Sequence, residues 1–404
     1  MLDENTRKYY TGFVWDVALN IVSSAIPIAV LQLVILPTIA SATSGEKNGQ
    51  IVTLISFLTL AAEPFGFALN NTKLLVNETY TMEKSRGDFN YLLLISIPLN
   101  AIIIIIGTIY YAPDGGAVFV FMMLLTSTII LLQRYFMVFF RLTLNYRRIL
   151  LDSFFLCTGY LIGLLLFNTS RDWILVYASG SIFSLSQTLW HNKLLKGPIR
   201  RTPFFKNILK KNSILLFVEF MNSIVKYADR LILYPLLGGV AVSIYYSATI
   251  ISKLISLAVT PLSTVILSYF SKMESLKRRT FYVMLSVGLT VGAVCYIFCV
   301  LIAESILNWL YPKWAAESMQ LVYITTACAV VGAVNNIVRP AVLKFRNISW
   351  QLLLGGADTV LYIGLAYTFF LIGGLKGFCI GLLINAIIQL FLRVVIFLTQ
   401  PQST

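Results

Sequence analysis

Long apolar runs with few charges constrain this chain more than any other feature of its sequence. The run Tyr91–Tyr111 contains no charged residue, and about 20 apolar residues in a helix cross the hydrocarbon core of a bilayer. Only 12% of the 404 residues are charged and 58% are hydrophobic, whereas a soluble domain carries about 25% charged residues. A water-soluble globular protein is therefore excluded. We predict an all-α, polytopic membrane protein with twelve spans, near 15–40, 50–70, 90–112, 116–138, 149–168, 172–190, 213–236, 240–266, 281–303, 319–340, 350–372 and 374–397.

The distribution of Lys and Arg predicts how these spans are oriented. The chain has 31 Lys and Arg against 17 Asp and Glu, a net charge of +14. With alternating spans, most of the cations fall at the N-terminus and in every second loop, as the positive-inside rule requires of cytoplasmic segments. We therefore predict a protein of the bacterial cytoplasmic (inner) membrane with both termini in the cytoplasm. The net charge is then a topology signal, and we expect no nucleic-acid partner.

The longest basic loop separates six predicted spans from the next six. Pro37 and Pro64 in the first half recur as Pro235 and Pro261 in the second, each late in its span. Weak parallel repeats of this kind are known among transporters. We predict an N-lobe at 1–190, a basic cytoplasmic linker at 191–212 and a C-lobe at 213–404, with a central cavity between the two six-helix lobes. The linker mixes bases with Phe204 and Phe205, so it is either an amphipathic segment on anionic lipid or a plain positive-inside connection.

Ionisable residues inside the predicted spans are the candidate functional residues. A charge at the bilayer centre costs about 2.5 kcal/mol or more, so it normally faces a partner or water. Polar residues of the seventh span follow one another at steps of three and four and share a helix face. They are Asn222, Lys226, Asp229 and Arg230, while Lys253 lies near the middle of span eight, Glu63 near the middle of span two and Arg134 at the cytoplasmic end of span four.

Four of these cations form a predicted anion-binding set. Arg guanidinium groups bind phosphate in a bidentate manner, and Lys acts as a point charge. We assign Lys226, Arg230, Lys253 and Arg134 to an anionic ligand. Three alternatives stay open: Lys226 pairs with Asp229 three residues away, Glu63 or Glu219 neutralises Arg230, or Arg134 is only a topology charge.

The remaining polar residues are assigned to coupling or to the polar wall of the cavity. Glu63 is the candidate carboxylate for coupling to H+, and Na+ is a second possible coupling ion. A salt bridge between the halves is the alternative role for Glu63. Asp229 and Asn222 are predicted to line the cavity.

The sequence carries no signature of an enzyme. It has no Gly-rich phosphate loop, no nucleophile triad and no cluster with metal-ligand spacing. The five cysteines all fall in predicted spans, where they read as packing residues. All predicted exterior loops are short, which argues against an external catalytic domain. We therefore predict no enzymatic activity, no cofactor and no metal.

Several segments resemble one known family, the polysaccharide repeat-unit flippases (Wzx-type, for O-antigen or capsule). The stretch Tyr227–Lys272 has an Asp-Arg pair, a Leu-Gly turn, a Tyr-x-x-Ala element at Tyr245–Ala248 and a late proline. YPKWAAESMQ and GGLKGFCIGLL, in the C-terminal part, also fit that family. These flippases are similar to the multidrug-and-toxin (MATE) exporters and to the peptidoglycan-precursor flippases, all with two six-helix lobes.

The resemblance implies a flippase for undecaprenyl-pyrophosphate-linked oligosaccharide. Such a protein moves the repeat unit from the inner to the outer leaflet by alternating access, while the polyprenyl tail stays in lipid. The lipid-linked oligosaccharide and the bilayer are then its partners, and a polymerase of the same pathway is a further expected one. The alternative is a MATE-type antiporter of small molecules or cations, which the buried bases argue against because cationic substrates favour an acidic cavity.

Overall fold

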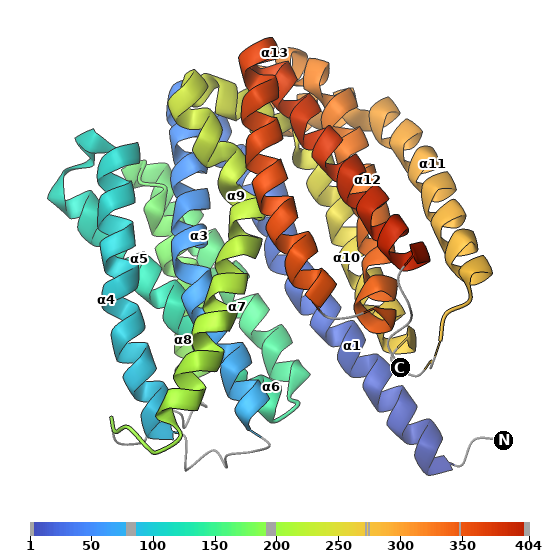
Figure 1. Cartoon of the computed structure of the whole chain (residues 1–404). Helices are drawn as coiled ribbons and strands as arrows, with labels where there is room; N and C mark the ends of the chain where they lie inside the picture. Colours follow the sequence, from blue (N-terminus) through green and yellow to red (C-terminus); the bar gives the residue numbers. More distant parts are fainter. Residues whose placement is uncertain are drawn as a thin grey trace. The chain divides into compact units, whose positions relative to one another are not determined.

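All regular secondary structure in the described residues is helical. The computed structural model describes residues 4–77, 86–190, 199–270, 273, 275–346 and 349–399. Among them, nine helical segments are long and apolar enough to cross a membrane, so the chain is an all-helical, multi-pass membrane protein (Figure 1). The elements are α1 (Glu4–Val30), η1 (Leu31–Ile35), α2 (Leu36–Ser41), α3 (Gly45–Val76), α4 (Arg86–Tyr111), η2 (Pro113–Gly115), α5 (Gly116–Phe136), α6 (Val138–Leu142), α7 (Tyr146–Ser170), α8 (Ile174–Trp190), α9 (Phe205–Ala248), α10 (Ile250–Phe270), α11 (Arg278–Leu310), η3 (Pro312–Trp314), α12 (Ala315–Phe345) and α13 (Ser349–Thr399).

The chain forms two compact units. Unit 1 comprises Met1–Ala42 and Thr53–Tyr227, and unit 2 comprises Thr43–Val52 and Ala228–Thr404. Helices α3 and α9 therefore contribute to both units. The twelve-span count and the lobe boundaries stay predictions, and residues 191–198 of the predicted linker lie outside the described residues. Helix α9 begins at Phe205, inside the predicted linker rather than at 213.

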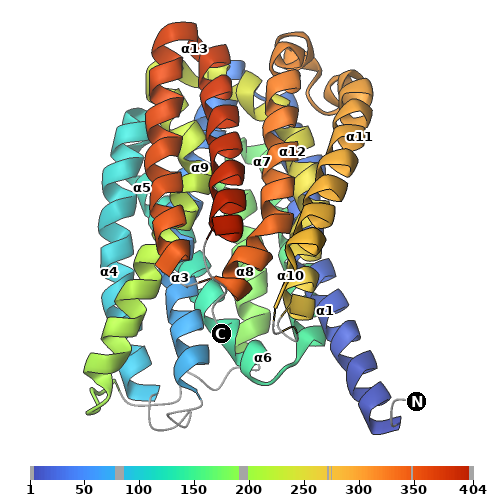
Figure 2. The same cartoon turned by 45° about the vertical axis from the view of Figure 1, so that its right-hand side comes forward.

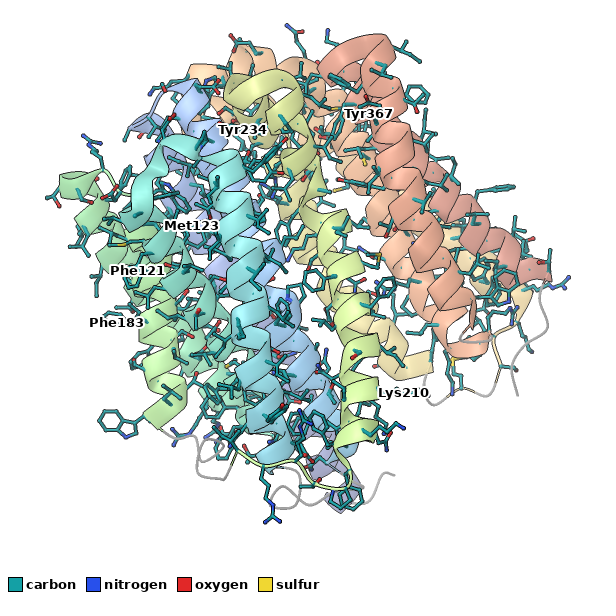
Figure 3. The ribbon with its side chains drawn as sticks, turned by 60° about the vertical axis from the view of Figure 1, so that its left-hand side comes forward. Phe121, Met123, Phe183, Lys210, Tyr234 and Tyr367 are labelled. Atoms are coloured by element: carbon teal, nitrogen blue, oxygen red, sulfur yellow. The ribbon has the colours of Figure 1, made fainter. Side chains whose placement is uncertain are left out.

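Helix α5 buries one face and exposes the other. On α5, the side chain of Met123 is fully buried, whereas that of Phe121 is 64% exposed (Figure 3). An exposed aromatic side chain is favourable where the surrounding solvent is lipid. The buried faces meet in a core of unit 1 formed by Phe65, Leu69, Val76, Phe89, Leu92, Leu93, Leu131, Tyr135, Phe136, Val138 and Ile208.

Glycines break two long helical runs where the sequence predicted the ends of spans. Gly238 interrupts α9 with φ 77°, and Gly373 and Gly374 interrupt α13. Gly238 and Gly374 have a positive φ, a backbone conformation that residues other than glycine rarely adopt. The parts of α13 before and after Gly373–Gly374 lie side by side (Figure 2). Their contact is so close that a Cβ on Gly377 would lie 2.0 Å from the Phe369 carbonyl oxygen.

The first helix of unit 1 accommodates a proline through a local change of helix type. Pro37 has no N–H to donate to the preceding turn, which disrupts an α-helix. Immediately before it, Leu31–Ile35 form a π-helix. A π-bulge is a common way to absorb such a disruption within a helix.

In unit 2, the start of α3 packs tightly against the break in α9. Both carboxylate oxygens of Glu46 accept the Gly239 N–H at 3.0 Å, which caps the helical segment that follows Gly238. The Asn48 amide donates to the Ser243 hydroxyl at 3.0 Å. The backbones meet at two glycines, since a Cβ on Gly49 would lie 1.8 Å from the Gly239 carbonyl oxygen. Small residues at such crossings allow the closest helix approach.

We predict that Gly49→Val destabilises the folded protein by about 1–3 kcal/mol, the usual cost of forcing extra volume into a packed contact. The midpoint of thermal unfolding of the purified protein in detergent checks this. Gly332→Ala is the matched control, because nothing lies within 4 Å of a Cβ at that position. An unchanged midpoint for Gly49→Val would show that this contact does not matter for stability.

Candidate functional site

The seven predicted site residues fall into two clusters, one in each unit. The unit 1 cluster contains Glu63, Arg134, Asn222 and Lys226, and the unit 2 cluster contains Asp229, Arg230 and Lys253. Lys226 and Asp229 are one helical turn apart on α9, and the chain passes from unit 1 to unit 2 between them.

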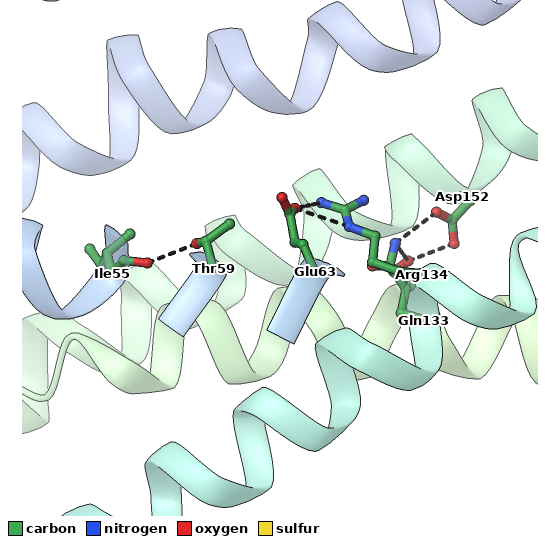
Figure 4. Close-up of polar contacts among 7 residues, drawn as sticks. Ile55, Thr59, Glu63, Gln133, Arg134 and Asp152 are labelled. Atoms are coloured by element: carbon green, nitrogen blue, oxygen red, sulfur yellow. Dashed lines mark hydrogen bonds and ion pairs between the residues drawn. The ribbon is translucent and has the colours of Figure 1, made fainter. Parts of the chain in front are cut away.

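The unit 1 cluster is organised around an ion pair between α3 and α5. Both Nε and Nη2 of Arg134 donate to Oε1 of Glu63, at 3.1 and 2.6 Å (Figure 4). Glu63 is 8% exposed, so the pair satisfies a carboxylate that would be costly alone. Gly66, one turn after Glu63, lets the helices approach, because its Cβ would lie 2.5 Å from the Cβ of Arg134. The sequence suggested a salt bridge between the two halves for Glu63, whereas the observed pair joins two helices of unit 1.

Lys226 and Tyr227 approach the same carboxylate from α9. The charge of Lys226 acts on Glu63, and Tyr227 forms a hydrogen bond with it. The Lys226 ammonium also lies 4.8 Å from the centre of the Tyr227 ring. In contrast to Glu63, the side chains of Lys226 and Asn222 are exposed. Since a charged side chain within a span avoids lipid, an exposed lysine at this position points to a water-filled space.

Further polar residues on α3, α6 and α9 continue the unit 1 cluster. The Arg141 Nη1 donates to the side-chain oxygens of Asn70 and Asn71, at 2.8 and 3.2 Å. The Asn71 amide in turn donates to Glu219 at 3.1 Å. This arrangement holds a second arginine, seven residues after Arg134, by amides rather than by a direct ion pair.

A buried network that the sequence did not indicate lies next to Arg134. Asp152 on α7 is 2% exposed and accepts from Ser184 at 2.6 Å and from Thr188 at 3.1 Å. The neighbour of Arg134, Gln133, donates to Asp152 at 3.4 Å and to Ser184 at 2.8 Å (Figure 4). These bonds fix the part of α5 from which Arg134 extends. Isolated Ser, Thr and Gln residues in apolar runs gave no signal of this network.

In the unit 2 cluster, a tyrosine and an arginine share one carboxylate. The Tyr245 hydroxyl donates to Oδ2 of Asp229 at 2.9 Å. Arg230 Nε lies 3.7 Å from Oδ1 of Asp229, an ion pair without a close hydrogen bond. Asp229 is 6% exposed. The Tyr-x-x-Ala element noted in the sequence therefore supplies the residue that orients the aspartate of the Asp-Arg pair.

The aromatic ring of Tyr246 brings the two cations of unit 2 together. The Lys253 ammonium lies 3.1 Å from the ring centre, and the Arg230 guanidinium lies 5.1 Å from it. Cation–π contacts contribute about 0.5–2 kcal/mol each. The Lys253 Nζ is buried and has no hydrogen-bond partner within the described part of the chain. An ammonium group with three unused donors is ready to bind an anion.

Each cluster has more cations than carboxylates among the predicted site residues, which suits binding of an anion. Unit 1 has Arg134 and Lys226 against Glu63, and unit 2 has Arg230 and Lys253 against Asp229. Within the described residues, no group of three or more His, Cys, Asp or Glu side chains is placed to hold a metal ion. The sequence identified the charged residues but missed the tyrosines, because Tyr227, Tyr245 and Tyr246 look like ordinary aromatic residues of a span.

We predict that Arg134→Gln destabilises the protein by about 2–3 kcal/mol. Removing one partner of a fully buried ion pair costs roughly 3–5 kcal/mol, and the cost is smaller here because the Arg134 side chain is 31% exposed. Glu63 then loses its closest cation. The double variant Glu63→Gln with Arg134→Gln should recover about half of that loss, since no unpaired carboxylate remains. Thermal unfolding in detergent compares the wild type, the single variants Glu63→Gln and Arg134→Gln, and the double variant. Strictly additive effects would contradict the pairing.

Comparison with known proteins shows the fold. No family model and no curated protein sequence matches the chain. A structure of the lipid II flippase MurJ in an inward closed conformation has 15% identity and a TM-score of 0.69, over 97% of this chain and 87% of that one. A MATE structure in complex with MaL6 has 14% identity and a TM-score of 0.62, over 95% of this chain and 94% of that one. An outward-facing multidrug resistance MATE family transporter of the MOP superfamily has 14% identity and a TM-score of 0.60, over 95% of this chain and 94% of that one. The chain thus has the fold that MurJ and MATE transporters share.

Proposed function

We propose that this protein is a flippase for undecaprenyl-pyrophosphate-linked oligosaccharide repeat units of a surface polysaccharide such as O-antigen or capsule. It takes the substrate from the inner leaflet of the bacterial cytoplasmic membrane and releases it into the outer leaflet by alternating access. Both termini lie in the cytoplasm. A polymerase of the same pathway uses the product. The fold shared with a lipid II flippase supports a lipid-linked substrate.

The excess of cations over carboxylates is the observation that carries this proposal. Lys253 has a buried ammonium without a hydrogen-bond partner among the described residues, and Lys226 is exposed within an apolar span. A pyrophosphate offers several oxygens to such groups. A cationic substrate would instead be repelled by Arg230, Lys226 and Lys253. The alternative, a MATE-type antiporter of small molecules or cations, is supported only by the shared fold.

The ion pair of Glu63 provides a route for coupling to protons. While Glu63 is ionised, it holds Arg134 through two hydrogen bonds to one oxygen. Protonation removes the charge of the carboxylate, and Arg134 and Lys226 are then released toward an anionic ligand. The membrane potential adds to the driving force, because moving one negative charge outward gains about 2.3 kcal/mol per 100 mV.

The first test is complementation of a deletion strain. The wild-type gene should restore surface polysaccharide, whereas Lys226→Ala with Arg230→Ala should not, and complete single repeat units should accumulate in the inner leaflet. Lys206→Ala with Lys210→Ala is the matched control, because it removes two exposed cations outside both clusters. Equal membrane levels of each variant are checked by immunoblotting.

Surface polysaccharide that is unaffected by the deletion would overturn the proposed substrate, and loss of resistance to toxic cations in the same strain would favour the antiporter. Full activity of the double variant at equal protein level would remove Lys226 and Arg230 from the site.

We predict that Glu63→Gln makes flipping in proteoliposomes insensitive to a pH gradient, because a glutamine cannot take up the proton. Transport is measured with and without the gradient. Glu219→Gln, which changes another carboxylate of unit 1 that is hydrogen-bonded to an amide, should keep the gradient response. A normal response of Glu63→Gln would exclude proton coupling at this residue.

A further inference from the structure

A buried tyrosine of unit 2, Tyr311, carries a hydroxyl that none of the contacts described above uses. Tyr311 directly follows the last residue of α11 and is 2% exposed. Its hydroxyl makes no hydrogen bond to any residue that the structure describes. A buried hydroxyl without a partner destabilises a folded protein, so native structures rarely keep one without a reason.

Local structure fixes the position of the Tyr311 side chain. The Tyr311 N–H donates to the Leu307 carbonyl oxygen at 2.7 Å, which closes the last turn of α11. The Tyr311 carbonyl oxygen accepts the N–H of Trp314 at 3.1 Å across η3. The rings of these two residues also pack together, with their centres 6.5 Å apart. The backbone and the ring are therefore held in place independently of the hydroxyl.

Tyr311 lies beside the ring around which the two cations of unit 2 gather. Its ring centre is 6.4 Å from that of Tyr246, and the two rings are nearly perpendicular, at 80°. Lys253 and Arg230 lie 3.1 and 5.1 Å from the same Tyr246 centre. The Tyr311 hydroxyl is also close enough to Arg230 for an electrostatic interaction. A hydroxyl, an ammonium and a guanidinium group thus surround one aromatic ring.

The carboxylate of this cluster does not serve the unused donors. Asp229 accepts from the Tyr245 hydroxyl at 2.9 Å and forms its ion pair with Arg230. The Lys253 ammonium and the Tyr311 hydroxyl both make no hydrogen bond within the described part of unit 2. Both groups donate hydrogen bonds, so an anion with several oxygens would satisfy them together.

We propose that the Tyr311 hydroxyl donates a hydrogen bond to the anionic group that Lys253 and Arg230 bind, and that this group is the pyrophosphate of the substrate. This role of Tyr311 rests on the proposed function. Two charges attract any anion, whereas a neutral donor adds a fixed direction. A pyrophosphate has enough oxygens for all three donors, and the carboxylate of an acidic sugar has fewer. The donors are covered in this structure, so the anion reaches them when the surrounding helices separate during alternating access.

The test is binding of inorganic pyrophosphate to the full chain in neutral detergent, by isothermal titration calorimetry. Tyr311→Phe removes the hydroxyl and keeps the ring contacts with Tyr246 and Trp314. It should bind about tenfold more weakly than wild type, the factor expected for roughly one hydrogen bond to a charged group. Its thermal unfolding midpoint without ligand should be unchanged or higher, because a buried hydroxyl without a partner has been removed.

Tyr135→Phe is the matched control. The Tyr135 hydroxyl is also buried without a hydrogen-bond partner among the described residues, but it lies in the core of unit 1. This variant should keep the wild-type affinity for pyrophosphate. A loss of affinity equal to that of Tyr311→Phe would show a general effect of removing a buried hydroxyl and would contradict the role of Tyr311.

Other outcomes separate this role from the proposed function. Equal affinity of wild type and Tyr311→Phe, with weaker binding by Lys253→Met, would overturn the role of Tyr311 alone. No binding by wild type, or no effect of Lys253→Met, would overturn the anion site on which both proposals depend. A lower unfolding midpoint of Tyr311→Phe would indicate a structural role instead. Glucuronate that binds as tightly as pyrophosphate, with the same loss in Tyr311→Phe, would contradict the assignment to pyrophosphate.

Discussion

The cost of placing a charge in hydrocarbon is the constraint on which the rest of this structure depends. An ionised side chain within a span must find a counter-charge, hydrogen-bond donors or water. Glu63 has Arg134, Lys226 and Tyr227 around it, and Asp229 has Tyr245 and Arg230. Asp152 is satisfied by neutral donors alone. Each of these three carboxylates thus has partners that stabilise its charge.

The cations Lys253 and Lys226 have fewer protein partners than these carboxylates, and this difference points to function. The ammonium group of Lys253 rests on the face of Tyr246 and makes no hydrogen bond to the described residues. Lys226 is exposed although its helix is apolar enough to cross a membrane. A protein selected only for stability would gain from replacing such residues with apolar ones. Their presence is expected if an anionic ligand completes their coordination during transport.

The sequence predicted the helical membrane fold because hydropathy and the spacing of charges are local properties. It placed breaks near 236–240 and 372–374, where Gly238 and Gly373–Gly374 interrupt α9 and α13. It also singled out Glu63 and Arg134, but not as partners, since 71 residues separate them and periodicity carries no information on which helices are neighbours. The roles of Gly49, Gly66 and Tyr246 were missed for the same reason: each depends on what lies across a helix contact.

Flipping by the purified protein tests most directly whether these cations serve an anionic lipid-linked substrate. Proteoliposomes are loaded with undecaprenyl-pyrophosphate oligosaccharide, and the fraction accessible to an added glycosidase is followed with time. We expect rapid exposure of the inner-leaflet substrate with wild type, and rates near those of empty liposomes for Lys253→Met, which keeps the length of the side chain without its charge. Wild-type rates for Lys253→Met, or no exposure by wild type, would contradict this role of Lys253.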